Sequence, residues 1–360
     1  MKNYLKYYNF YNLYIDNLIN KGEEMASLYL TEDGTHLTLK DNRILIKKSS
    51  EILKEISLEK VDNIVIVGNV SITSPLSIEL LEREIPVNWL SKTGKFYGRL
   101  EPTTRVNIAR QREQFRCSDN IEFSLDLAKN FIIGKVKNCQ VVLRRYNRNF
   151  DYDDVQENIE ELKRYVLKIS EAETIEQLLG YEGNCAKLYF KSLGQMVKED
   201  FKFDKRTRRP PKDKFNCLLS LGYTLLLYEI YTAIVNKGLN PYCSFLHKIR
   251  NGHPALASDL IEEWRPTIVD SLVMNLVQTR IITSDHFLPQ DETTGGVFLT
   301  KEGLKIFIKK FEDRLKQHNS YLTYVDYPLT FRESLQFQVG SLVKAIEENN
   351  STIYRTILIR

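Results

Sequence analysis

The stretch 240–266 carries one histidine and two acids whose types and spacing suit chemistry. They are His247, Asp259 and Glu262. A helix is expected to begin after Pro254, because proline is favoured in the first turn of a helix. Asp259 and Glu262 would then share a face of that helix, since they lie three residues apart. One imidazole and two carboxylates converging on a point suit a hard divalent cation that acts on phosphate oxygens. The alternative is a solvated acidic helix end beside an unrelated histidine, and the stretch alone leaves both open.

Glu182 is a further acid in an unusual position. Thr174 and Gln177 fit a capping box, so a helix is expected to begin there. Along that helix Glu182 falls on an apolar stripe, with Leu178, Ala186 and Tyr189. A carboxylate there is expensive to bury, so it should be neutralised, paired or bound to a metal. Gly180 and Gly183 on either side suggest that something approaches closely, and a structural salt bridge is the alternative.

Two groups of basic residues suit contact with a phosphate backbone. The segment 204–214 is held extended by two prolines, and its cations are Lys205, Arg206, Arg208, Arg209, Lys212 and Lys214. A rigid basic segment of this kind favours phosphate binding, although many charge runs are only solvated loops. The second group is Arg144, Arg145 and Arg148, at the end of an expected helix. Here the alternative is the favourable pairing of cations with a helix C-terminus.

Composition narrows the class of protein. The 360 residues are 42% hydrophobic, enough for one large or two ordinary domains, and the net charge is only +4. Five cysteines without a C-x-x-C pair argue against a disulfide framework and against a zinc ribbon. A run of 18 apolar residues is absent, so we expect no membrane span and a cytoplasmic protein.

The rest of the chain predicts the elements that must position these side chains. Between 27 and 99, short β-branched or alternating runs are separated by hairpin signals such as Asp33-Gly34. From about Arg105 apolar residues recur every three or four positions, which is typical of helices. We expect Ser118 to cap the first helix and Pro266 to stop the one after Pro254. The helices are expected over about 119–146, 154–169, 175 onward, 215–235, 255–264, 301–316 and 331–348.

The expected fold class is therefore α+β. A β-rich, sandwich-like domain over 25–103 would be followed by a larger all-α catalytic domain over 104–360. The β-rich domain shows no catalytic constellation, so its expected task is dimerisation or docking. Residues 1–24 form a Tyr- and Asn-rich extension, which is either an upstream in-frame start or a short arm that packs on the body. It lacks the features of a secretory signal.

Three blocks of this sequence resemble one family. They are QLLGYEGNCAKLYF around Glu182, RTRRPPKDKFNCLLSLGYTLL, and GLNPYCSFLHKIRNGHPALASDLIEEWRP. Together, in this order and spacing, they resemble the CRISPR-associated spacer-acquisition endonuclease and integrase family, CRISPR-associated protein one. The resemblance runs from about Met25 to the end, including RVNIARQREQF and VFLTKEGLKIFIKKFEDRL, and leaves 1–24 uncovered.

The resemblance implies a metal-dependent DNA endonuclease and integrase of CRISPR adaptation, an antiviral defence. Such an enzyme joins the 3′-OH ends of captured DNA fragments into the repeat array by transesterification. The resemblance places the Mg²⁺ or Mn²⁺ ligands on Glu182, His247 and Glu262, with Asp259 as a supporting acid of the same catalytic site. The sequence has His253 where a basic residue is expected, and this histidine is a candidate DNA contact.

The resemblance also implies partners. The family forms homodimers through its N-terminal domain and assembles with a small ferredoxin-like protein, CRISPR-associated protein two. Its DNA partners would be duplex fragments with 3′-OH ends and CRISPR repeat DNA, held here by the two basic groups. Two alternatives remain: a related integrase of a mobile element, and a non-catalytic DNA-binding scaffold whose acids are structural.

Overall fold

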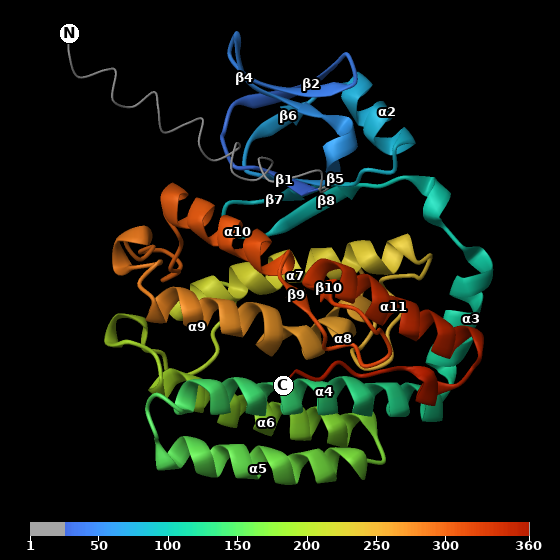
Figure 1. Cartoon of the computed structure of the whole chain (residues 1–360), viewed down its shortest axis with the longest axis vertical. Helices are drawn as coiled ribbons and strands as arrows, with labels where there is room; N and C mark the ends of the chain where they lie inside the picture. The colour runs from blue at the N-terminus through green and yellow to red at the C-terminus, as the bar shows by residue number, and fades with distance from the viewer. Residues whose placement is uncertain (1–25, 360) are drawn as a thin grey trace. The chain divides into compact units, whose positions relative to one another are not determined.

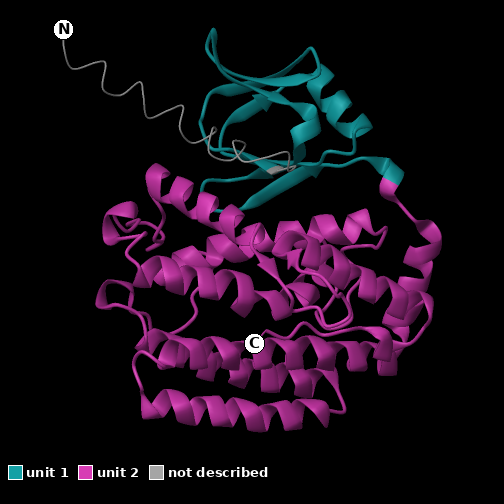
Figure 2. Cartoon of the chain, in the orientation of Figure 1, with its two compact units in different colours: residues 1–104 teal, residues 105–360 magenta. Residues whose placement is uncertain are grey.

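The computed structural model describes residues 26–359, and the chain divides into two compact units, 1–104 and 105–360 (Figure 2). The first unit carries the strands of two four-stranded sheets and the second is helical, so the predicted α+β fold class is confirmed. The division falls where the sequence pattern changes from strands to helices. The expected extension 1–24 lies outside the described residues.

The first unit consists of two sheets with a shared apolar core. One sheet has the order β1-β5-β7-β8 and the other β4-β3-β2-β6. The strands are β1 (Ala26–Leu30), β2 (Thr35–Lys40), β3 (Arg43–Lys48), β4 (Glu51–Ser57), β5 (Val61–Val67), β6 (Val70–Ile72), β7 (Val87–Leu90) and β8 (Phe96–Leu100). The β2–β3 hairpin turns at Asp41 and Asn42, both of which adopt positive φ. Helix α2 (Ser74–Glu82) contributes Leu76 and Leu80 to the core.

The second unit is built around α4 (Ile121–Asn147). This helix packs against α5 (Asp153–Ser170), α6 (Ile175–Gln195) and α8 (Ala255–Trp264), and α5 and α6 run alongside it in Figure 1. Its apolar stripe supplies fully buried side chains such as Phe131 and Ile132. The other elements include α3 (Ile108–Asp119), α7 (Lys214–Asn236), α9 (Ser271–Gln278), α10 (Lys301–Leu315), α11 (Phe331–Glu347) and the short pair β9 (His318–Asn319) and β10 (Leu329–Thr330).

Helix α7 has the length and mean hydropathy of a membrane span, although the sequence holds no uninterrupted run of 18 apolar residues. It is the one helix with these properties among residues 26–359. Half of its most apolar stretch is buried inside the protein, and it packs against α8 and α11. The prediction of a core helix over 215–235 agrees with this packing.

Two predicted helix boundaries were wrong. The long helix expected over about 119–146 is α4, but the Asn120 side chain, rather than that of Ser118, caps it by accepting the Phe123 N–H. Ser118 lies instead inside α3, a separate helix that precedes it. Pro266 does not stop the chain after α8. The helical path continues through a π-helical segment, η5 (Arg265–Asp270), into α9. Proline has no N–H to donate to the preceding turn, and a local change to π-helical geometry lets the chain continue past that missing hydrogen bond.

Candidate active site

One cavity of about 120 Å³ in the helical unit brings the predicted metal ligands together. Glu182 comes from α6, Glu262 from α8, and His247 from the loop between α7 and α8. The cavity is lined by these three residues and by Ile132, Leu179, Arg208, Leu246 and Arg265. Residues about 80 positions apart in the sequence therefore face one small space.

Lys135 joins the two glutamates. Its Nζ lies 2.6 Å from Glu262 Oε2 and also pairs with Glu182, and its side chain is only 11% exposed. Burial alone would lower the pKa of Lys135, but the attraction of Glu182 and Glu262 raises that pKa above its ordinary value. The lysine is therefore a firmly charged cation between two carboxylates.

Asp259 organises the loop that carries His247. Its fully buried carboxylate accepts the backbone N–H groups of Phe245, Leu246 and His247 at 2.8, 3.1 and 3.0 Å. It also lies 2.8 Å from His247 Nδ1. Burial would lower the pKa of His247, but the hydrogen bond to Asp259 raises it above its ordinary value. With Nδ1 donating to Asp259, the lone pair of the neutral ring lies on Nε2.

Asp259 and Glu262 therefore have different surroundings, although their spacing alone left open that both act on one point. Asp259 holds the loop and does not line the cavity, whereas Glu262 does. Residues three apart on a helix point about 60° apart, so they reach different neighbours. The glycines beside Glu182 also differ from expectation. A Cβ atom at Gly180 or Gly183 would meet no atom within 4 Å in the described chain, so no close approach occurs there.

Arg265 links the cavity to a buried polar network. Its guanidinium lies 3.2 Å from Glu262 Oε1 and over the ring of Tyr223. Burial would raise the pKa of Glu262, but Arg265, Lys135 and the histidine lower it to about 2. The Tyr223 hydroxyl in turn donates to Asp270, which also accepts from Tyr189 at 2.8 Å. Glu262 is therefore an anion held between two cations.

The donor set fits Mg²⁺ or Mn²⁺ by type, since two carboxylates and an imidazole suit these ions. Among residues 26–359, however, no three His, Cys, Asp or Glu side chains lie close enough together to hold an ion as they stand. The Lys135 ammonium lies between the two acids instead. Glu262 Oε2 is buried and is not aligned for a hydrogen bond with any described residue, despite its 2.6 Å contact with Lys135. The residues therefore fit the ion if this ammonium moves.

The cations of the basic segment 204–214 differ in what they contact. Arg208 is exposed and lines the cavity, and Arg209 is also exposed. Lys212 donates to the carbonyl of Thr294. Arg206 turns inward, where it donates to Asn216 Oδ1 at 2.8 Å and to Ser220 Oγ at 3.0 Å. Internal acceptors therefore engage the Arg206 guanidinium, and its expected contact with DNA stays a prediction.

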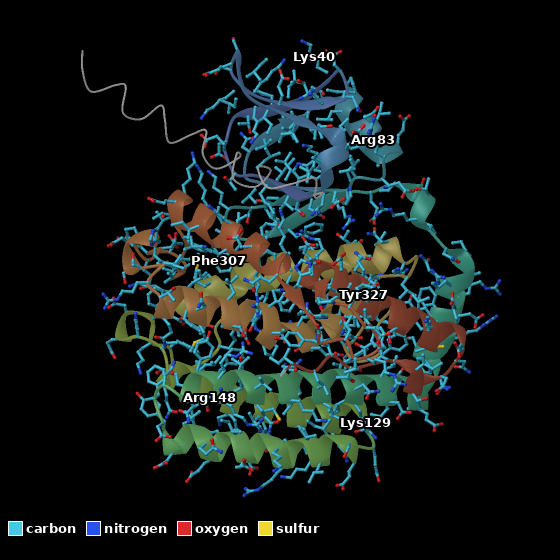
Figure 3. All side chains as sticks on the ribbon, viewed as in Figure 1. Lys40, Arg83, Lys129, Arg148, Phe307 and Tyr327 are labelled. Carbon is cyan, nitrogen blue, oxygen red and sulfur yellow. The ribbon has the colours of Figure 1, made fainter. Side chains whose placement is uncertain are left out.

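The other predicted DNA contacts lie away from the cavity. Arg144, Arg145 and Arg148 are exposed at the end of α4, and Figure 3 shows Arg148 at one end of this helix with Lys129 toward the other. Arg144 is nine residues beyond Lys135, roughly 14 Å along the helix axis. His253 is absent from the cavity lining and lies 3.1 Å from Ser258 Oγ.

Lys135 and Arg265 are two site residues that the sequence reading did not identify. Lys135 lies three residues after Ile132 on the apolar stripe of α4. A buried charge on such a stripe needs a partner, which is the same signal that singled out Glu182. Arg265 was taken only as part of a helix stop, and the continuing π-helical segment brings it to the cavity instead.

Asp270 gives a pH-dependent prediction. Burial raises its pKa from 3.8 to about 6, although the hydroxyls of Tyr223 and Tyr189 favour the anion. The folded state thus holds the proton more tightly, and Asp270 costs stability as pH rises through about 4 to 6. Asp270→Asn cannot ionise. The unfolding free energy of Asp270→Asn minus that of wild type should therefore rise by about 3 kcal/mol between about pH 4 and pH 7, as measured by urea titrations. Unfolding free energies that change with pH in the same way in both proteins would contradict this prediction.

The fold and the cavity by themselves define the class of protein. It is a two-unit α+β protein whose helical unit places two glutamates and a histidine around one cavity. The sequence matches the family model described as CRISPR associated protein Cas1 over residues 28–313. It is 32% identical to the CRISPR-associated endonuclease Cas1 of Mycobacterium tuberculosis over 323 residues, 90% of this chain and 94% of that protein. The chain belongs to the Cas1 family.

Solved structures agree with this assignment. The chain resembles the CAS1 protein from Thermotoga maritima with a TM-score of 0.76 and 28% identity, over 89% of this chain and 97% of that one. It also resembles a chain in a Cas6-RT-Cas1–Cas2 complex, with a TM-score of 0.80 and 26% identity. That match covers 93% of this chain and 36% of the longer one.

Proposed function

We propose that this protein is a metal-dependent DNA endonuclease and integrase of CRISPR adaptation, which joins the 3′-OH ends of captured DNA fragments into the repeat array. The observation that carries the proposal is the single cavity lined by Glu182, His247 and Glu262, with Arg208 beside them, in a member of the Cas1 family. Carboxylates, an imidazole and a guanidinium are the groups that a phosphate-directed metal site requires.

The reaction is a one-step transesterification. The 3′-OH of the fragment loses its proton as its oxygen bonds to the phosphorus at the repeat boundary. The bond from that phosphorus to the 3′ oxygen of the target strand breaks, and the leaving oxygen takes up one proton, so no net proton is consumed. No covalent bond to the enzyme forms. A Mg²⁺ or Mn²⁺ ion, held by Glu182, His247 and Glu262, would supply positive charge to the phosphoryl oxygens in the transition state.

The chain's own residues prepare the site for this chemistry. Asp259 fixes the loop and the ring orientation of His247 by four contacts from one buried carboxylate. Arg265 keeps one oxygen of Glu262 paired at 3.2 Å, which holds the α8 carboxylate in place. Arg208 lies at the cavity with its side chain exposed, where it can hold a backbone phosphate of the bound DNA.

DNA would be held largely through its phosphates. Arg208 is an exposed cation that lines the cavity, and Arg209 and Lys212 are exposed in the same segment. The exposed arginines at the end of α4, Arg144, Arg145 and Arg148, would hold DNA farther from the cavity. Neutralising phosphates releases counterions, so binding should weaken steeply as salt rises and depend little on sequence. His253 remains a further candidate contact to DNA.

The proposed assembly is a homodimer that binds a small ferredoxin-like partner. The strand-rich unit is the proposed dimerisation unit, since the described catalytic candidates all lie in the helical unit. The similarity to a chain in a Cas6-RT-Cas1–Cas2 complex supports a partner of the Cas2 kind.

An integration assay tests the proposal. The protein, with and without a small partner of the Cas2 kind, is mixed with a duplex bearing 3′-OH ends and a plasmid that carries the repeat. We expect joined product with Mg²⁺ or Mn²⁺ and none with EDTA. DNA binding that ignores EDTA, with no nicking or joining of any substrate, would instead identify a non-catalytic scaffold. Efficient joining into DNA without the repeat would favour an integrase of a mobile element.

A further inference from the structure

The position of Lys135 points to a role beyond a structural ion pair. Its ammonium is nearly buried, at the centre of the longest helix, and contacts acids from two other helices. Those acids, Glu182 and Glu262, are both proposed ligands of the divalent ion. One cation therefore already lies between the two acids, where the proposed function requires another.

Charge balance explains why a cation is needed there at all times. Two carboxylates that share one small, partly buried site repel each other, because little water is present to screen their charges. A shared ammonium reverses the sign of that interaction, and a divalent ion would do the same. The two cations cannot occupy the same position between the two carboxylates, so they compete for it.

The contacts of Lys135 are suited to displacement. The Lys135 ammonium lies 2.6 Å from Glu262 Oε2, so an ion at that position would take over the same oxygen. The other oxygen, Oε1, is paired with Arg265, so Glu262 keeps one partner when the ammonium leaves. A lysine carries its charge as a compact group on a flexible four-carbon stem, which can swing without movement of the helix.

We propose that Lys135 is a built-in counter-ion that occupies the place between Glu182 and Glu262 in the metal-free protein and is displaced when a divalent cation binds. This inference rests on the proposed metal-dependent function and deepens it. Lys135 is then a positioning residue that offsets the repulsion between the two acids and holds both at one point before the ion arrives. It also makes the metal-free site less attractive to stray cations, because binding must first break two ion pairs.

The test measures Mn²⁺ binding to the full-length protein without DNA, by calorimetry and by loss of the free Mn²⁺ electron-spin signal. Lys135→Met removes the ammonium and retains an apolar stem. We expect its melting temperature without metal to fall, its Mn²⁺ affinity to rise about tenfold, and its stabilisation by Mn²⁺ to exceed that of wild type. Lys137→Met, an exposed site on the same helix, should match wild type in all three measurements.

Further variants separate the outcomes. Lys135→Arg retains the charge and should not gain affinity, and Lys135→Gln replaces the methionine variant if the latter does not fold. Suppose that wild type binds Mn²⁺, that Glu262→Gln does not, and that the Lys135 variants bind Mn²⁺ no more tightly than wild type. This result would overturn the inference about Lys135 and leave the proposed metal dependence standing. If neither wild type nor Lys135→Met binds Mn²⁺, both the inference and the proposed metal dependence fail. Binding gained only by Lys135→Met would support the displacement directly.

Discussion

A Glu262→Gln variant is expected to lose about 10³-fold or more of its metal-dependent strand-transfer rate, a loss typical of removing one group that stabilises a transition-state charge. Glutamine keeps the size of the side chain and removes its charge. In wild type the pKa of Glu262 is about 2, so this residue is an anion throughout the working range. Its side chain is 5% exposed and faces the cavity, which leaves water little room to replace the lost carboxylate.

The fold should survive this substitution, because Lys135 keeps Glu182 as a partner and Arg265 keeps its position over Tyr223. The measurement is the initial rate of joining a 3′-OH duplex to repeat DNA, with the near-ultraviolet circular dichroism as a check of packing. Glu176→Gln, in the exposed first turn of α6, is the matched control and should retain the wild-type rate. A Glu262→Gln rate within tenfold of wild type would exclude Glu262 as a ligand of the reacting ion.

Much of the fold could be predicted because local patterns and tertiary packing agree. Helix α8 begins after Pro254 and ends at Trp264 as expected, and α6 begins after the Thr174 cap. The path of the chain after α8 was predicted less well. A proline usually ends a helix, but here the following segment is fully buried in the unit, and packing stabilises a π-helical continuation. Tertiary contacts of this kind leave no local trace in the sequence.

The site was predicted only in part, for a similar reason. Spacing identifies which residues share a helix, but not which neighbour each one faces. Asp259 and Glu262 look equivalent in the sequence, yet one binds a loop and the other faces the cavity. Arg206 and Arg208 belong to one basic run, yet only Arg208 lines the cavity, because Asn216 and Ser220 draw the other inward. Such distinctions depend on three-dimensional partners.

The second prediction with a large expected effect concerns residues 351–359, called the tail below. The tail contacts α4 and α8, and Glu263 of α8 accepts two of its hydrogen bonds. The Tyr354 hydroxyl and the Ile357 N–H each donate to the Glu263 carboxylate at 2.6 Å. Asn138 of α4 donates to the carbonyls of Glu263 and Ile357 and accepts the N–H of Ile359. The tail therefore ties α4, three residues from Lys135, to α8, one residue from Glu262.

Ending the chain after Asn350 is expected to prevent stable folding of the helical unit. The truncation removes three buried side chains, Tyr354, Ile357 and Ile359, and a buried apolar side chain contributes about 1.5–3 kcal/mol. It also leaves the Glu263 carboxyl group without two of its donors, at a further cost of about 1–3 kcal/mol for each unsatisfied group. The total is comparable with the whole stability of a typical domain, about 5–15 kcal/mol.

A matched pair of point variants tests the same contact without truncation. Ile357 is fully buried and Leu358 is 38% exposed, although they are neighbours of equal size. Ile357→Ala should lower the unfolding free energy by about 2–5 kcal/mol, because it opens a cavity between α4 and α8. Leu358→Ala should cost less than about 1 kcal/mol, as exposed sites usually do. Urea unfolding followed by circular dichroism measures both, and equal costs for the two variants would show that the tail does not hold these helices together.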